Sequence, residues 1–98
     1  VAELGLDEDH VATFVVDVSD EAQVKAAVEG AIAKWGSLDA MVNNSGDNGS
    51  YKPIAELTKE DFMKVYDINV FGVMYGMKLT VLHPFVKRLN HYYFKRQI

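Results

Sequence analysis

Two short apolar runs, residues 11–16 and 38–42, constrain the fold of this 98-residue chain more than any other feature. The first run is continuous and rich in β-branched side chains, which suits a strand that is buried on both faces. The second run stops at residues 43–46, with the sequence Asn-Asn-Ser-Gly. These residue types favour a tight polar turn, and in open α/β sheets such turns line the ligand crevice. An ordinary exit from a strand is the alternative interpretation.

A helix is expected between the two runs. Asp20 followed by Gln23 gives a capping-box pattern, which predicts that the helix begins there. Gly36 is the expected stop. The apolar side chains between these signals recur at helical spacing and indicate one buried face, formed by Val24, Val28, Ala31, Ile32 and Trp35.

A longer helix is expected over residues 58–82. Thr58 and Asp61 predict its N-cap, and Pro84 would disturb its far end. A single helical face carries a stripe, Phe62, Val65, Asn69, Gly72 and Gly76, whose two glycines allow another backbone to approach closely. The order strand, helix, strand, loop, helix predicts an α/β fold. It corresponds to an incomplete Rossmann-like domain with a doubly wound parallel sheet.

Composition excludes several classes of function. The chain has no cysteine, and its three histidines, His10, His83 and His91, lack the spacing of metal ligands, so no metal site is expected. No apolar run approaches the ~20 residues of a membrane span, and no signal-peptide pattern is visible. The net charge of −4 argues against nucleic acid as a partner. We therefore expect a cytoplasmic protein that binds neither nucleic acid nor membrane.

The charge is distributed unevenly along the chain. Residues 79–98 carry four basic side chains and no acidic one, although acidic groups outnumber basic groups in the whole sequence. Residues 89–98 are aromatic and basic and show no clear period. We therefore predict a partial nucleotide-binding domain over residues 1–88 and a divergent tail over residues 89–98.

Four short motifs occur in order and at fitting distances. They are Asp17-Val18 after the first run, Trp-Gly-Ser-Leu-Asp at residues 35–39, Asn-Asn-Ser-Gly at residues 43–46, and Asn-Val-Phe-Gly at residues 69–72. Together they resemble the middle of a short-chain dehydrogenase/reductase. The resemblance covers residues 1–88.

The resemblance implies a binding site for NAD or NADP. Asp17 and Val18 correspond to the pair that flanks the adenine ring, with a carboxylate that accepts from the exocyclic amine and a backbone N–H that donates. Asn44, Ser45 and Gly46 correspond to the turn beside the cofactor ribose. Taken alone, without the resemblance, Asp17 is better interpreted as a turn acid after a strand.

Asn69 corresponds to the helical asparagine of the family's catalytic tetrad, which helps to hold the active-site lysine through water. An amide on an apolar stripe needs hydrogen-bond partners, so a satisfied core amide is the alternative. The resemblance also implies that the helix over residues 58–82 forms a homo-oligomer interface in the full-length parent.

The implied activity is hydride transfer between nicotinamide and a small carbonyl or secondary-alcohol substrate. The family's glycine-rich phosphate turn would precede residue 1, and its serine, tyrosine and lysine would follow the matched region. We therefore expect residues 1–98 alone to be inactive. A non-catalytic nucleotide-binding or subunit-interaction module is the alternative function.

The implied sheet also raises a packing problem. In the doubly wound order 3-2-1-4-5-6, the two expected strands are the third and the fourth. Two other strands would separate them, which places their centres ~14 Å apart. The chain must then either expose strand edges or pair its strands in a non-native way.

Overall fold

The computed structural model describes residues 5–7 and 9–82, so the predicted tail 89–98 and Pro84 lie outside the described residues. Three α-helices are formed, α1 (Glu21–Trp35), α2 (Lys59–Tyr66) and α3 (Gly72–Leu82). A short 3₁₀-helix, Ile54–Glu56, precedes α2, and a π-helical segment, Asp67–Phe71, joins α2 to α3. The helix expected over residues 58–82 is therefore present, with a widened turn at its middle.

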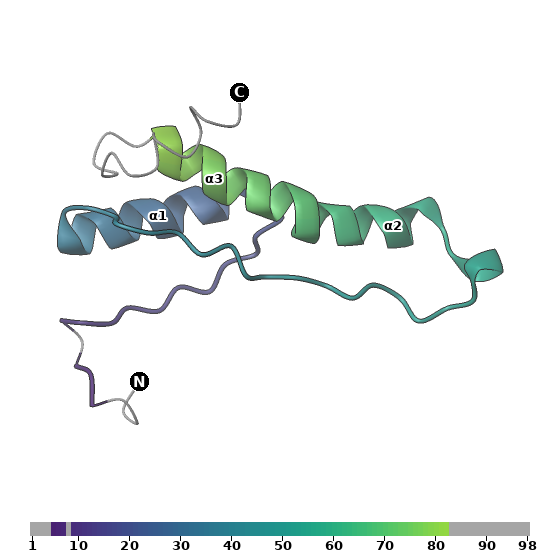
Figure 1. Cartoon of the computed structure of the whole chain (residues 1–98), viewed down its shortest axis with the longest axis horizontal. Coiled ribbons are helices and arrows are strands. Elements are labelled where there is room, and N and C mark those ends of the chain that lie inside the picture. The colour runs from purple at the N-terminus through teal and green to yellow at the C-terminus, as the bar shows by residue number, and fades with distance from the viewer. Residues whose placement is uncertain (1–4, 8, 83–98) are drawn as a thin grey trace.

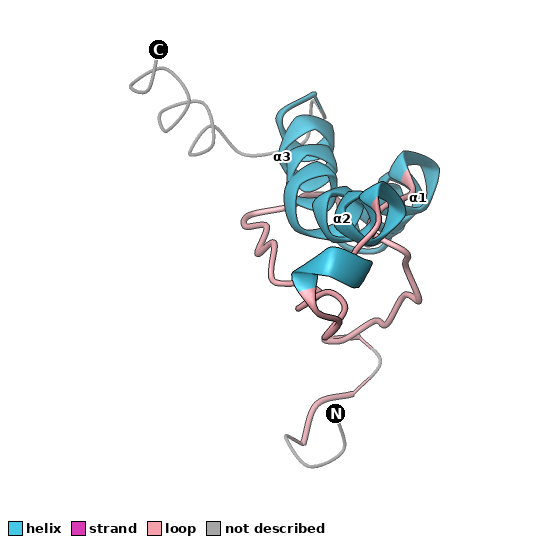
Figure 2. Cartoon of the chain, turned by 90° about the vertical axis from the view of Figure 1, so that its right-hand side faces the viewer, coloured by secondary structure: helices cyan, strands magenta, loops and turns pink. Residues whose placement is uncertain are grey.

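Helices α1 and α3 pack against each other, and two long extended segments lie mostly on one side of them (Figures 1 and 2). The first extended segment leads into α1, and the second leaves α1 and leads towards α2. Figure 1 shows that both segments run in the same direction and that α1 and α3 run the opposite way. This is the arrangement of strands and helices in a parallel α/β unit.

The two strands predicted over residues 11–16 and 38–42 are not formed. Within the described part of the chain, only an isolated bridge at Leu38 interrupts the irregular backbone of these segments. Residues 12–16 and 40–46 make no backbone hydrogen bond there. A strand is defined by its pairing, and the strand order keeps these two segments too far apart to pair with each other. The chain is extended where strands were predicted, but among the described residues no continuous ladder forms along these segments.

Helix α1 follows from its sequence signals. The Asp20 side chain accepts a hydrogen bond from the Ala22 N–H, and Gly36 ends the helix in the left-handed region at φ 81°. Val24, Val28 and Ile32 are buried, whereas the predicted face member Trp35 stays partly exposed. The predicted capping box is not reciprocal, because the Asp20 N–H already donates to the Asp17 carbonyl oxygen.

The N-terminus of α2 carries the expected cap. The Thr58 hydroxyl accepts from the Asp61 N–H at 3.2 Å, and the Asp61 carboxylate accepts from the Thr58 N–H at 2.9 Å. These two bonds satisfy donors that the start of a helix leaves unpaired. The bonds that the Asp61 carboxylate accepts from the Thr58 N–H and from the Thr58 hydroxyl hold the pKa of Asp61 below its ordinary value. The capping prediction at Thr58 is confirmed.

The stripe of α2 and α3, defined here as Val65, Asn69, Gly72 and Gly76, covers the second extended segment and the end of the first. A β-carbon added to Gly72 would lie 2.9 Å from a methyl of Val18, and one added to Gly76 would lie 1.9 Å from the Asn43 Oδ1. The predicted close approach at the two glycines is thus confirmed. Phe62, at the start of the predicted stripe, is instead 48% exposed.

The stripe and the second extended segment run antiparallel in matched steps. Val65 contacts the position of Gly49, Asn69 binds Asp47, and Gly76 meets Asn43. The stripe thus meets the segment at three successive points, the last of them in the bonded loop at residues 47–49.

The contact between Gly76 and Asn43 gives a first prediction. Gly76→Ala should lower the free energy of unfolding by ~1–3 kcal/mol, because the added methyl overlaps the Asn43 amide. In an Asn43→Ala background the overlap is removed, so the same substitution should be neutral or should stabilise by up to ~1 kcal/mol through helix propensity. Urea denaturation of the four proteins in this double-mutant cycle measures both effects.

Equal destabilisation by Gly76→Ala in the two backgrounds would contradict this packing. Such a result would mean that something other than the Asn43 side chain limits the space at residue 76.

Candidate functional site

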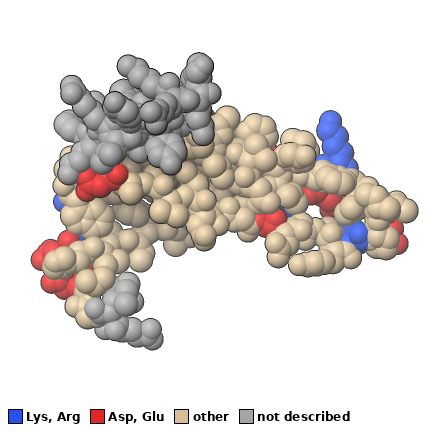
Figure 3. All heavy atoms as spheres, in the orientation of Figure 1, with Lys and Arg blue, Asp and Glu red and all other residues tan. Residues whose placement is uncertain are grey.

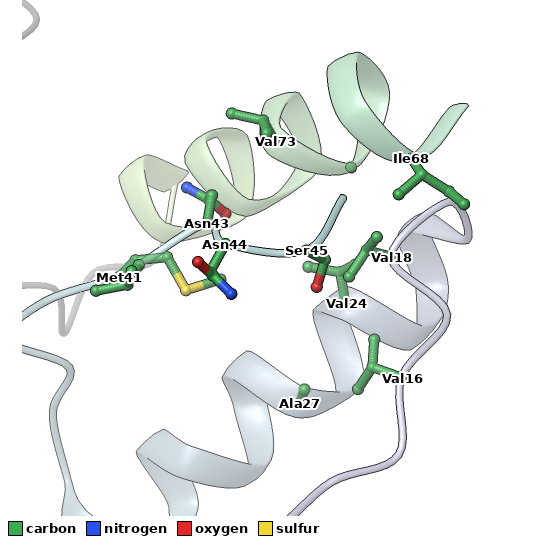
Figure 4. A pocket seen from close by; sticks show the side chains of 12 residues that line it. Val16, Val18, Val24, Ala27, Met41, Asn43, Asn44, Ser45, Ile68 and Val73 are labelled. Carbon is green, nitrogen blue, oxygen red and sulfur yellow. The ribbon is translucent and has the colours of Figure 1, made fainter. Parts of the chain in front are cut away.

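A cavity of about 170 Å³ lies between α1, α3 and the ends of both extended segments (Figure 4). Val16 and Val18 contribute from the first segment, and residues 41–45 contribute from the second. Val24 and Ala27 of α1 and Gly72 and Val73 of α3 form the remaining walls with Ile68. The cavity is mainly apolar, and its polar groups come from Asn43, Asn44 and Ser45.

Asp17 and Val18 form a turn directly before α1. One carboxylate oxygen of Asp17, Oδ1, accepts hydrogen bonds from the Ser19 hydroxyl at 2.6 Å and from the Ser19 N–H at 3.0 Å. These bonds favour the ionised form and lower the pKa of Asp17 below its ordinary value. The Gln23 Oε1 accepts from the Asp17 N–H at 2.8 Å and so ties the turn to α1.

This turn also identifies two residues that the sequence analysis did not assign. Ser19 and Gln23 shape the Asp17 turn through the bonds just described. The signal for the backbone bond lies in Asp17 itself, because an aspartate side chain commonly accepts from the N–H two residues further on, whereas the additional bond from the Ser19 hydroxyl has no such signal. The sequence pattern predicts Gln23 only as a capping partner of Asp20, whereas its side-chain oxygen binds the N–H of Asp17, three residues before Asp20.

Residues 43–46 follow the other extended run, and the tight turn predicted there is not formed, because the backbone stays open and makes no turn hydrogen bond at these residues. Asn44, Ser45 and Gly46 are all exposed, so this stretch presents an amide, a hydroxyl and a bare backbone to the surroundings. Asn43 instead lies against Gly76 of α3. Figure 4 shows the side chains of Asn43, Asn44 and Ser45 in the space between α1 and α3.

Asn69 binds the backbone that follows residues 43–46. Its Oδ1 accepts from the Asp47 N–H at 2.7 Å, and its Nδ2 donates to the Asp47 carbonyl oxygen at 2.9 Å. Both polar atoms of the Asn69 amide therefore bond to the backbone of one residue, Asp47. This agrees with the expectation that an amide on this stripe needs hydrogen-bond partners. Asp47 was not assigned by the sequence analysis, since a backbone partner leaves no side-chain signal.

The Asp47 side chain extends this arrangement into the following loop. Its Oδ1 accepts from the N–H of Gly49 at 2.8 Å, and Gly49 itself lies in the left-handed region at φ 81°. Asn69 thus holds a short loop that is internally bonded. The direct effect of the Asn69 side chain is to hold the backbone at Asp47, one residue after Gly46.

The predicted site residues are brought together by α3 rather than by one cavity. Gly72 approaches Val18, Gly76 approaches Asn43, and Asn69 binds next to Gly46. Asp17 and Gly46 do not line the cavity. A volume of about 170 Å³ is below the ~300–1,000 Å³ of ordinary small-molecule sites, so a dinucleotide would lie over the exposed ends of the two extended segments rather than inside the cavity.

The exposed groups at the ends of the two extended segments are hydrogen-bonding groups. Asp17 offers a carboxylate, Asn44 and Ser45 offer an amide and a hydroxyl, and Gly46 leaves space for close approach. Within residues 5–7 and 9–82 no group of three acidic or histidine side chains is arranged to hold a metal ion. In the same residues no helix is long and apolar enough to cross a bilayer.

Comparison with known proteins decides the family. A sequence profile for short chain dehydrogenases matches residues 1–89. The chain belongs to the short-chain dehydrogenase family. The resemblance found in the four motifs is thereby confirmed.

Two curated family members illustrate the match. Levodione reductase from Leifsonia aquatica is 43% identical over 68 residues, which are 69% of this chain and 26% of the reductase. L-2,3-butanediol dehydrogenase from Corynebacterium glutamicum is 41% identical over 71 residues, which are 71% of this chain and 27% of that enzyme. The chain thus spans about a quarter of the length of these relatives.

Solved structures match the same region. The crystal structure of levodione reductase matches with a TM-score of 0.66 at 42% identity, over 70% of this chain and 27% of the reductase. A 3-ketoacyl-(acyl-carrier-protein) reductase from Brucella melitensis complexed with NADH matches with a TM-score of 0.65 at 34% identity, over 71% of this chain and 29% of that one. ElxO with NADPH bound also matches with a TM-score of 0.65, at 33% identity, over 71% of this chain and 28% of that one.

These neighbours are Rossmann-fold proteins, which supports the predicted fold class. This short-chain dehydrogenase segment reproduces the helices and the course of the chain, and within the described residues it lacks the paired sheet. The roles assigned to Asp17, Val18, Asn44, Ser45, Gly46 and Asn69 stay predictions, as does the cytoplasmic setting.

The paired bonds of Asn69 give a second prediction. Asn69→Ala removes both bonds to Asp47, so the Asp47 amide should lose its protection against hydrogen exchange. Asn69→Asp keeps the acceptor and removes the donor, so the Asp47 amide should stay protected at neutral pH. Amide exchange followed by NMR measures both variants, and Asn69→Ala should also cost ~1–3 kcal/mol of folding free energy.

Equal protection of the Asp47 amide in Asn69→Ala and in the wild type would show that Asn69 does not hold this loop. The Gly49 amide, which is bonded by the Asp47 side chain, serves as an internal reference.

Proposed function

We propose that this chain is part of an NAD(P)-dependent oxidoreductase that moves hydride between nicotinamide and a small carbonyl or secondary-alcohol substrate. One observation carries the proposal. Val18 and Asn43, at the carboxyl ends of the two extended segments, both lie against α3. In doubly wound sheets, this edge is where dinucleotides bind.

The relatives support a nicotinamide cofactor. The matched Brucella melitensis reductase is complexed with NADH, and the matched ElxO has NADPH bound. The nicotinamide ring supplies the hydride, or accepts it, when the cofactor is bound. The relatives include both cofactor types, so the proposal names NAD or NADP.

The geometry of Asp17 supports its proposed contact with the adenine. Ser19 binds Oδ1 through two hydrogen bonds, and no bond to Oδ2 is formed within the described residues. The lowered pKa keeps the carboxylate ionised at neutral pH. A fixed, ionised carboxylate with one open oxygen is suited to accept a hydrogen bond from an exocyclic amine.

A graft tests this contact as the third prediction. Residues 11–78 are placed in levodione reductase, whose structure matches this chain, and Asp17→Asn is introduced. Asparagine keeps an oxygen for Ser19 but replaces Oδ2 by a donor, so the turn should persist while the adenine contact is lost. The KM for the cofactor should rise about 10- to 150-fold with kcat nearly unchanged, since a uniform binding contact acts on KM.

Ser19→Ala in the same graft is the control, because it loosens the turn but leaves the carboxylate in place. The adenine role of Asp17 is wrong if Asp17→Asn changes kcat but leaves the cofactor KM unaltered.

A second candidate function, subunit interaction, is favoured by the outer face of α2 and α3. This face carries a row of exposed apolar side chains, Met63, Tyr66, Val70, Met74 and Met77. The exposed fractions lie between 38% and 52%, and the spacing of three and four residues places the row on one side of the helix. Such a contiguous apolar surface is typical of protein interfaces.

The fourth prediction concerns this row. If it mediates self-association, Met74→Lys should shift residues 1–98 towards the monomer, because it puts a charge at the centre of the contact. Ile54→Lys is the matched control, as Ile54 is 77% exposed but lies outside the row. Sedimentation velocity over a range of concentrations measures the shift, and identical behaviour of the two variants would exclude the row as an interface.

A further inference from the structure

Residues 48–49 form the only Asn-Gly pair in the sequence. The backbone nitrogen of a residue that follows an asparagine can attack the side-chain carboxamide carbon, because both groups are held close together in one chain and the attack closes a small, unstrained ring. A side chain on the following residue hinders this approach, and glycine removes the hindrance. The surroundings of the pair then decide whether the reaction is favoured.

Packing against α2 requires a glycine at residue 49. A β-carbon added there would lie 2.9 Å from the Val65 Cγ2, and Gly49 has a φ of 81°, which other residues rarely adopt. No side chain can therefore shield the Gly49 nitrogen unless the loop moves. The contact that places the loop on the helix thus leaves this nitrogen accessible to the preceding side chain.

Asp47 places a base on the same nitrogen. Its Oδ1 accepts a hydrogen bond from the Gly49 N–H at 2.8 Å, within the range over which a carboxylate can take up a proton. The Asp47 backbone is itself bound by both polar atoms of Asn69. The carboxylate is thus aimed at the proton that must leave when the Gly49 nitrogen attacks.

The Asn48 side chain is not held away from this nitrogen. Asn48 is exposed, and within the described residues its side chain makes one hydrogen bond, from Nδ2 to the Tyr51 hydroxyl oxygen at 3.5 Å. This distance is long for a hydrogen bond, and Tyr51 is itself 89% exposed. Rotation of the carboxamide towards Gly49 therefore breaks no strong contact.

We propose that Asn48 is a site of spontaneous covalent modification, in which the Asp47 carboxylate takes the Gly49 N–H proton as the Gly49 nitrogen bonds to the Asn48 Cγ. The bond between Cγ and Nδ2 then breaks, and Nδ2 leaves as ammonia with the proton that Asp47 took up. Water opens the resulting cyclic imide. Cleavage of the new N–Cγ bond gives aspartate, whereas cleavage of the original peptide bond gives isoaspartate, in which the backbone runs through Cβ and Cγ. No cofactor takes part, so the proposal does not rest on the oxidoreductase function.

Both products change the loop that packs on α2. Isoaspartate adds one atom to the backbone between Asp47 and Gly49, each of which contacts a different residue of the stripe. Both products also put a carboxylate beside a pocket of about 240 Å³ that Asn48 and Asp61 line. Asp61 pairs with Lys52 at 3.5 Å, and Figure 3 shows acidic and basic side chains close together at the end of the molecule where α2 begins. The new carboxylate would compete with Asp61 for the Lys52 ammonium.

The test incubates residues 1–98 at neutral pH and follows each asparagine by peptide mass spectrometry. Asn48 should gain the mass difference between a carboxamide and a carboxylate, and part of the product should be isoaspartate. Asn44 is the internal control, because it is also exposed but is followed by Ser45, which carries a β-carbon. An unmodified Asn48, or modification of Asn44 at the same rate, would overturn the proposal.

Two substitutions of Asp47 separate the base from the hydrogen-bond acceptor. Asp47→Asn keeps an oxygen for the Gly49 N–H but is no base, and Asp47→Ala removes both functions. Each should slow the modification of Asn48 about tenfold or more. Hydrogen exchange of the Gly49 amide, which should stay protected in Asp47→Asn, shows that the loop is retained. If Asp47→Asn reacts as fast as the wild type, or faster, the carboxylate only holds the loop and the proposal is wrong.

Discussion

The structure depends on the close approach between the stripe of α2–α3 and the ends of the two extended segments. Gly72 and Gly76 have no side chain, so Val18 and Asn43 reach the helix surface directly. Asn69 adds two hydrogen bonds to the Asp47 backbone. Without these contacts the extended segments would have few ties to the helices, because the buried side chains of the described residues are limited to Val24, Val28, Ile32 and Thr80.

The π-helical segment contributes to this arrangement. One turn of the helix, Asp67–Phe71, is wider than an α-helical turn, because the Gly72 N–H bonds to the carbonyl oxygen of Asp67, five residues earlier. Such widened turns are rare and are often found at functional sites. Here the segment contains Asn69, which binds the Asp47 backbone. The helix thus changes its regular bonding at the same place where its side chain holds the chain next to residues 43–46.

Local signals predicted the helices well. Asp20, Gly36 and Thr58 mark helix ends that the structure confirms, because capping depends only on neighbouring residues. The small residues at 72 and 76 correctly indicated close approach. The family was recognised from four motifs, and the profile match confirms it.

Non-local features could not be predicted in the same way. The sequence of residues 11–16 specifies an extended chain, but pairing requires a neighbour that no local pattern supplies. The bond from Gln23 to the Asp17 N–H and the clamp of Asn69 on Asp47 use backbone partners, which leave no trace in side-chain patterns. The π-helical turn depends on packing along the whole of α2–α3 and breaks a period that the sequence suggests is regular.

The difference between local and non-local features also applies to the candidate site. The ends of the extended segments that would meet a cofactor already lie against α3, while the backbone leading to each end is unpaired in the described chain. The Asp17 turn is also tied to α1, because the Gln23 Oε1 accepts from the Asp17 N–H. The stretch that carries Asn44 and Ser45 is held just beyond its end, where Asn69 binds Asp47. Precise placement of binding groups depends on such support, so the helices on both sides set the relative positions of the candidate groups.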